Sequence, residues 1–216
     1  GICHPVLLGN PDRLRRMATR LKLDLTGIEL IDMRADQEQG RRATYAKHLA
    51  KKRARQGYNF EEAYDKMYER NYFGMMMVET GEADAFITGL YTKYSNTIKV
   101  AKEVVGIRPE YKTFATMHIL NTKKGTFYIS DTLINRHPDE NVLMDVAKLS
   151  AHTVQFFNEE PHIAMISYSN FGTDEVGSPM KVHLAVEEMQ KQYPYLAIDG
   201  EMQVNFALNK ELRDDK

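Results

Sequence analysis

Short apolar runs typical of buried strands alternate with helix-type segments along most of the chain. Alternation of this kind favours parallel pairing, because each helix carries the chain back before the next strand begins. It predicts an α/β fold, a three-layer α/β/α arrangement in which helices cover both faces of a mostly parallel sheet. The expected strands are His4–Gly9, Ile28–Asp32, Asp84–Gly89, Lys112–Leu120, Thr126–Asp131, Ile163–Ile166 and a last run that begins at Tyr195.

Capping residues and apolar spacing indicate where the helices lie. Asn10 is a favourable N-cap, Pro11 suits the first helical position, and apolar residues follow at the spacing of one helix face. The basic run Arg41–Gly57 is interpreted as a solvated helix face with an inward stripe of alanines, rather than as a nucleic-acid patch. The other expected helices are Arg41–Gln56, Phe60–Thr80, Thr97–Val105, a helix opened by Pro138 and Asp139, and Val182–Gln192.

Composition narrows the class of protein. The 216 residues include 29 basic and 30 acidic side chains, so no strong field favours nucleic acid or an anionic membrane as the main partner. A single cysteine, Cys3, cannot form an internal disulfide, which favours a reducing, cytoplasmic setting. The first residues do not form a signal peptide, and no apolar run reaches membrane-spanning length. We therefore expect a cytoplasmic globular protein.

Polar side chains follow four of the expected strands. In open α/β sheets ligands bind outside the carboxyl ends of the strands, so these side chains suit a phosphate-bearing or acyl-bearing ligand. The loop that starts at Ser167 also has glycines, which let a ligand approach the backbone, and it leads into a helix N-terminus. For each loop taken alone, ordinary capping and turn chemistry is an equal alternative. The site residues predicted on this ground are Ser95, Thr97, Asp131, Asn135, Arg136, Ser167, Ser169, Asn170, Asp199 and Glu201.

Several common site motifs do not occur. The sequence has no P-loop, no G-x-G-x-x-G and no G-x-S-x-G, and its seven histidines form no metal-ligand array, so no metal site is predicted. His152 and His183 fall inside expected helices and are interpreted as structural residues. The residues alone therefore indicate a cleft for an anionic small molecule and name no catalytic residue.

Four segments in order resemble the phosphate acetyl/butyryl transferase family. They are NYFGMMMVETGEADAFITG, FYISDTLINRHPD, IAMISYSNFGT and AIDGEMQVNFAL, and together they extend over most of the chain. The motifs S-x-S-N-F-G and D-G-E-M are most similar to those of the branch that is fused to bacterial NADP-dependent malic enzymes.

The resemblance implies a phosphotransacetylase-like fold of two subdomains, 1–138 and 139–216, which flank a cleft where CoA and an acyl phosphate meet. It implies a homodimer as the basic unit and CoA or acetyl-CoA as ligand. In the malic enzyme branch such a domain is linked to malic domains, and it supports oligomerisation and acetyl-CoA regulation. NADP and a divalent metal would belong only to those linked domains.

The sequence also departs from active members of the family. Lys99 stands where they have a phosphate-binding arginine, and lysine lacks the planar two-pronged donor. Asn205 stands where they have aspartate, and the second subdomain is expected to be incomplete at its C-terminus. The first reading is therefore an oligomerisation and acetyl-CoA-sensing domain of a malic enzyme without catalysis of its own. The alternatives are a phosphate acetyltransferase, in which Lys99 joins the hydroxyls in holding phosphate, and a scaffold with an empty cleft.

Overall fold

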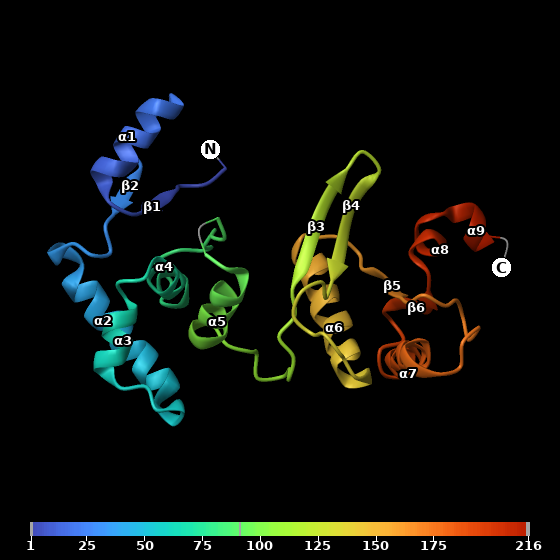
Figure 1. Ribbon diagram of the computed structural model, residues 1–216. Coiled ribbons are helices and arrows are strands. Elements are labelled where there is room, and N and C mark those ends of the chain that lie inside the picture. The colour runs from blue at the N-terminus through green and yellow to red at the C-terminus, as the bar shows by residue number, and fades with distance from the viewer. Residues whose placement is uncertain (1, 91, 215–216) are drawn as a thin grey trace. The chain divides into compact units, whose positions relative to one another are not determined.

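The structure is a computed structural model that describes residues 2–90 and 92–214 (Figure 1). The chain divides into two compact units, Gly1–Gly106 and Ile107–Lys216. These units differ from the predicted subdomains 1–138 and 139–216, whose boundary stays a prediction. Among the described residues, no helix combines the length and the apolar character that crossing a bilayer requires.

Unit 1 is mainly helical, with one short pair of strands near the start of the chain (Figure 1). Strands β1 and β2 are parallel, with Val6 opposite Glu29 and Leu8 opposite Ile31. The elements are β1 (Val6–Leu8), α1 (Pro11–Leu21), β2 (Glu29–Ile31), η1 (Asp36–Glu38), α2 (Gln39–Arg53), η2 (Ala54–Gln56), α3 (Phe60–Lys66), α4 (Arg70–Glu79) and α5 (Tyr94–Val104).

Local sequence signals place several of these elements correctly. Asn10 caps α1 by accepting the Arg13 backbone N–H, as the N-cap pattern predicts. The single helix predicted over Phe60–Thr80 is wrong, because α3 ends in a tighter turn and Glu69, with extended backbone, starts α4. Met67, at the end of α3, and Phe73, in α4, are both fully buried in the same core.

The strand predicted at Asp84–Gly89 does not form in the described chain. This segment packs on α4 through its side chains instead. The Phe86 ring covers Gly74, where an added Cβ would lie 2.3 Å from the ring, and the Thr88 hydroxyl donates to Asn71 Oδ1 at 2.7 Å. Tertiary packing against a glycine-bearing helix face thus replaces backbone pairing.

Helix α2 buries Ala46 of the predicted alanine stripe and half-buries Ala43 and Ala50, but larger side chains share its inward face. Its buried side chains are Arg42, Tyr45, Ala46 and Leu49, while Ala54 is exposed. The larger apolar side chains remove more surface from water than alanines would, so they decide which face turns inward. The Arg42 side chain is buried with them because its guanidinium donates hydrogen bonds to two backbone carbonyls.

Unit 2 contains a β-hairpin, two long helices and a second pair of parallel strands. Strands β3 and β4, which fall within or near two of the expected strand segments, pair antiparallel as a hairpin from Met117 opposite Ser130 to Thr122 opposite Gly125. The core is formed by α6, α7, β5 and β6 around Met144, Met165 and Met189. The elements are β3 (Met117–Thr122), β4 (Gly125–Ser130), α6 (Glu140–Phe156), β5 (His162–Ile166), α7 (Gly177–Gln192), β6 (Ala197–Met202), α8 (Val204–Leu208) and α9 (Lys210–Asp214).

Candidate functional site

A cavity of about 1170 Å³ opens at the carboxyl ends of β1 and β2 in unit 1. Gly9 follows β1 and donates its N–H to Ile31, the last residue of β2, at 2.8 Å. The N-terminus of α1, residues 87–90 and Thr92 complete the wall. This is the place where α/β folds collect ligands, and we call it the strand-end cavity. Its lining residues include Gly9, Asn10, Arg13, Asp32, Arg34, Glu69, Arg70, Asn71, Thr88, Gly89 and Thr92.

Three arginines line the strand-end cavity: Arg13, Arg34 and Arg70. Within the described residues, none of their guanidinium groups forms an ion pair. Two carboxylates, Asp32 and Glu69, also line the wall, and Asp32 already accepts the Arg34 backbone N–H at 3.0 Å. A planar guanidinium can donate two parallel hydrogen bonds to a phosphate or a carboxylate. The cavity therefore suits an anionic ligand, and its α1 N-terminus adds a favourable dipole.

The residues predicted around Ser95 begin α5 and lie partly at this cavity. Thr97 Oγ1 is 3.1 Å from Oγ1 of Thr92, which lines the cavity, so Thr97 stands directly behind its wall. Ser95 is exposed in the first turn of the helix. Lys99 does not line the cavity, since its side chain is 67% exposed and its Nζ lies 3.9 Å from Glu103 Oε1.

The arginines of the strand-end cavity were missed by sequence reasoning. A signal for them was present, because the strand-end rule applied to four other strands also fits Gly9–Arg13 after β1. Arg34 and Arg70 carry no comparable local signal. They reach the cavity because the turn after β2 and the start of α4 meet there.

Glu103, the partner of Lys99, is the centre of a polar network in unit 1. Its carboxylate accepts the Tyr58 hydroxyl at 2.5 Å and the Tyr72 hydroxyl, and Lys66 lies at 4.0 Å. Burial would raise the pKa of Glu103, but these hydroxyls and lysines favour the charged form and hold the pKa below its usual value. Burial, together with the Glu103 carboxylate, raises the pKa of Tyr58 to about 12, so that hydroxyl remains a donor.

Replacing Glu103 by glutamine is expected to cost about 1 kcal/mol of unfolding free energy at neutral pH, because charge-assisted hydrogen bonds are lost. A lowered folded-state pKa gives stability that is complete above about pH 4.3, the unfolded value, and that disappears as pH falls through the folded value. Urea unfolding of both proteins should therefore give midpoints that differ at pH 7 and converge as the pH falls through the lowered pKa of Glu103. A difference that persists unchanged in acid would contradict this role of the carboxylate.

In unit 2 the predicted loop after β5 is fastened to the end of β6. Ser167 donates its N–H to the Met202 carbonyl and Phe171 donates to the Glu201 carbonyl, both at 2.9 Å. The Glu201 side chain accepts the Gly172 N–H at 2.6 Å. Asn170 Oδ1 accepts the Gln203 N–H at 2.9 Å. These bonds bring four predicted residues together, and we call the group with His183 the loop cluster: Ser167, Ser169, Asn170, Glu201 and His183.

Buried polar atoms without partners distinguish the loop cluster. Glu201 is fully buried, and its Oε2 lies 3.4 Å from His183 Nδ1 without hydrogen-bond geometry. The hydroxyls of Ser167 and Ser169 also lack partners among the described residues. A buried polar group left unsatisfied costs about 1–3 kcal/mol, so such groups require an explanation.

His183 is the member of the loop cluster that sequence reasoning missed. Its Nδ1 faces Glu201, and its Nε2 lies 3.5 Å from Glu187 Oε1, one helical turn further along α7. The imidazole thus stands between a buried carboxylate and an exposed one. A histidine in the middle of a helix gives no signal of this in the sequence, because the buried carboxylate comes from a different strand.

The hydrogen bonds that hold the remaining predicted residues go to groups outside the loop cluster. Asp131 accepts from Thr116 Oγ1 and from the Asn135 N–H, each at 2.7 Å. Burial would raise the pKa of Asp131, but these bonds outweigh burial and lower it. Asp199 accepts the N–H of its neighbour Gly200 at 2.8 Å, and Arg136 is exposed. For Asp131 and Asn135 the turn-chemistry alternative describes the geometry, while any ligand role stays a prediction.

In an α/β fold, a strand-end cavity that is lined by arginines has the donors that suit a small anionic molecule. The model of the family described as phosphate acetyl/butaryl transferase matches residues 1–216. The chain therefore belongs to this family, which confirms the resemblance seen in its motifs.

Two kinds of relatives match over the full length of the chain. The NADP-dependent malic enzyme of Escherichia coli K12 is 31% identical over 217 residues, which are 29% of that protein. The phosphate acetyltransferase of Thermoanaerobacterium thermosaccharolyticum is 31% identical over 223 residues, which are 66% of that protein. The chain thus spans less than a third of the first relative and about two thirds of the second.

Solved structures agree on the fold. A phosphotransacetylase from Streptococcus pyogenes superposes with a TM-score of 0.81 at 25% identity, covering 99% of this chain and 64% of that one. The EutD phosphotransacetylase from Staphylococcus aureus gives a TM-score of 0.77 at 25% identity, covering 98% and 64%. Both neighbours confirm the predicted phosphotransacetylase-like α/β fold.

Proposed function

We propose that this chain is a phosphotransacetylase-like domain of a malic enzyme that binds acetyl-CoA and serves regulation and oligomerisation without catalysis of its own. The strand-end cavity is the observation that carries the proposal. It offers three guanidinium groups without ion-pair partners in the described chain, in a volume of about 1170 Å³. Phosphate groups of a CoA-type ligand are the anions that such donors hold best.

Lys99 supports binding rather than turnover. Its charge is shared with Glu103 at 3.9 Å, and it presents a single ammonium where active family members use a two-pronged arginine. In this reading the homodimer is the basic unit, and NADP and a divalent metal belong to malic domains linked to the same polypeptide. The cytoplasm is the proposed location, since the free Cys3 is exposed and a reducing compartment keeps it as a thiol.

A phosphate acetyltransferase is the alternative function, and one observation favours it. Transfer from acetyl phosphate to CoA needs a group that takes the thiol proton. Oε2 of Glu201, which has no hydrogen-bond partner among the described residues, is an acceptor of the required kind. The sequence alone predicted Glu201 as a ligand-binding residue and did not indicate a role as a base. The relatives do not separate the two functions, because the malic enzyme and the transferase are each 31% identical to the chain.

Replacing Arg13 by alanine is expected to weaken acetyl-CoA binding about tenfold or more, because a charge-assisted contact to phosphate is lost. Arg16→Ala is the matched control, since Arg16 is an exposed arginine of the same helix and does not line the cavity. Titration calorimetry with acetyl-CoA measures both. Absence of binding to the unaltered protein, or an equal loss in both variants, would refute the proposed ligand site.

An assay of acetyl transfer between acetyl phosphate and CoA separates the two functions. The proposed function predicts acetyl-CoA binding without turnover. The alternative is established instead if the unaltered protein transfers acetyl groups and Glu201→Gln does not, while calorimetry still detects acetyl-CoA binding to that variant.

A further inference from the structure

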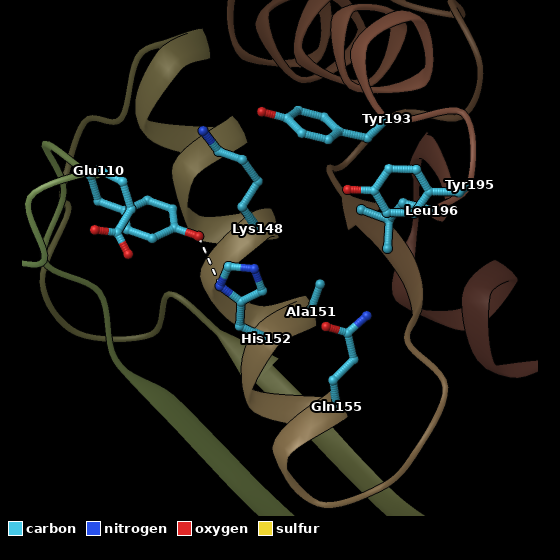
Figure 2. A pocket seen from close by; sticks show the side chains of 9 residues that line it. Glu110, Lys148, Ala151, His152, Gln155, Tyr193, Tyr195 and Leu196 are labelled. Atoms are coloured by element: carbon cyan, nitrogen blue, oxygen red, sulfur yellow. Dashed lines mark hydrogen bonds between the residues drawn. The ribbon is translucent and has the colours of Figure 1, made fainter.

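Unit 2 contains a second pocket, of about 260 Å³, that the proposed function does not use (Figure 2). One wall is a face of α6, with Lys148, Ala151, His152 and Gln155 at the spacing of successive helical turns. The opposite wall, seen in Figure 2, is the turn between α7 and β6, and Glu110 lies on a third side. Tyr111 also lines the pocket. The turn contributes Tyr193, Tyr195 and Leu196. We call this the tyrosine pocket.

Aromatic rings and their exposure make the tyrosine pocket unusual for a surface hollow. Tyr195 is 79% exposed, and its ring meets Tyr193 edge to face with centroids 6.2 Å apart. The Tyr195 ring is therefore exposed enough to stack with a flat partner. The volume lies below that of drug-sized ligand pockets, about 300–1,000 Å³, so the pocket suits a single ring system.

Charges in the pocket disfavour an ion of either sign. Lys148 Nζ is 2.8 Å from Asp145 Oδ1 and lies 5.4 Å and 5.9 Å from the ring centroids of Tyr111 and Tyr193. This ammonium already occupies the place that a ligand cation would take between the rings, and it would repel a second cation. An anion would meet a lysine already neutralised by Asp145, with the Glu110 carboxylate also on the wall.

Two side chains of α6 offer hydrogen bonds to a ring edge. The Tyr111 hydroxyl lies 2.9 Å from His152 Nδ1, and either atom can be the donor. When the hydroxyl donates, the imidazole carries its hydrogen on Nε2, which leaves His152 one donor for a ring edge. Gln155, one turn later, adds an amide that both donates and accepts, as nucleobase edges require.

We propose that the tyrosine pocket binds a flat, uncharged heteroaromatic ring of the nucleobase class, stacked on Tyr195 and hydrogen-bonded along its edge by His152 and Gln155. This inference does not rest on the proposed function, because the pocket lies in unit 2 and shares no residue with the strand-end cavity.

Adenosine is the probe, since it is an uncharged nucleoside with a hydrogen-bonding purine edge. Calorimetry on the purified protein is expected to give a Kd of about 0.1–1 mM, as the size of this ligand allows. Tyr195→Ala is expected to weaken binding at least about fivefold, because base–aromatic stacking is lost. Tyr168→Ala is the matched control, as Tyr168 is 63% exposed and lies outside the pocket.

The competing ligand classes are arms of the same experiment. Tetramethylammonium tests an aromatic cage for cations, and benzoate tests a flat anion. Tighter binding of either probe than of adenosine overturns the proposal. So does an absence of saturable adenosine binding, an equal loss in the two tyrosine variants, or loss of adenosine binding in Arg13→Ala. Adenosine binding that only Tyr195→Ala weakens supports it.

Discussion

Gly200→Ala is expected to lower the free energy of unfolding by about 3–5 kcal/mol, because backbone strain and overpacking add together. Gly200 has φ of 137°, a region that residues with a side chain rarely adopt. A Cβ there would lie 2.5 Å from the carbonyl oxygen of Met165, its partner in β5, and that strand cannot retreat without disturbing the core. Urea unfolding followed by circular dichroism measures the change.

Gly172→Ala is the matched control for this prediction. Gly172 also has positive φ, 77°, but nothing lies within 4 Å of an added Cβ. This variant is expected to lose only about 1 kcal/mol, the strain part of the effect. Equal losses in the two variants would show that the contact with Met165 does not matter. Because Gly200 precedes Glu201, Gly200→Ala should also disturb the loop cluster.

Arg42→Met is expected to destabilise the protein by about 1–3 kcal/mol, because it leaves the buried Met33 carbonyl without its donor and takes one of two donors from the Ala35 carbonyl, which also accepts the Glu38 N–H. Arg42 is 2% exposed, and its Nη1 donates to the carbonyls of Met33 and Ala35, each at 2.7 Å. Its guanidinium carbon also lies 4.5 Å from the centroid of the Tyr68 ring. Methionine keeps much of the volume, so the measured loss reports the hydrogen bonds rather than a cavity.

The same variant has a second expected effect, at the strand-end cavity. The two carbonyls held by Arg42 flank Arg34, which lines that cavity, so Arg42 acts as a positioning residue for it. Acetyl-CoA binding should weaken several-fold in the folded variant. Lys51→Met, an exposed change on the same helix, should alter neither stability nor binding by more than about 0.5 kcal/mol. Unchanged urea midpoints for Arg42→Met would contradict the role assigned to this side chain.

The candidate sites were predictable to different degrees. Ser167, Ser169, Asn170 and Glu201 were predicted as strand-end residues, and the structure brings them together through bonds between the loop and β6. The strand-end rule could identify each loop but not their contact. His183 was assigned a structural role because its helix spacing shows nothing of the carboxylate beside it.

By itself the sequence determined the α/β alternation, the family, and local features such as the Asn10 and Asp139 caps, because these depend on residues only a few positions apart. The tertiary structure alone decided which residues from distant segments meet. It replaced the strand at Asp84–Gly89 by packing on α4, turned Arg42 inward, and gathered the cavity arginines. The physical reason is that burial and hydrogen-bond partners for these groups come from segments far along the chain, which no local pattern records.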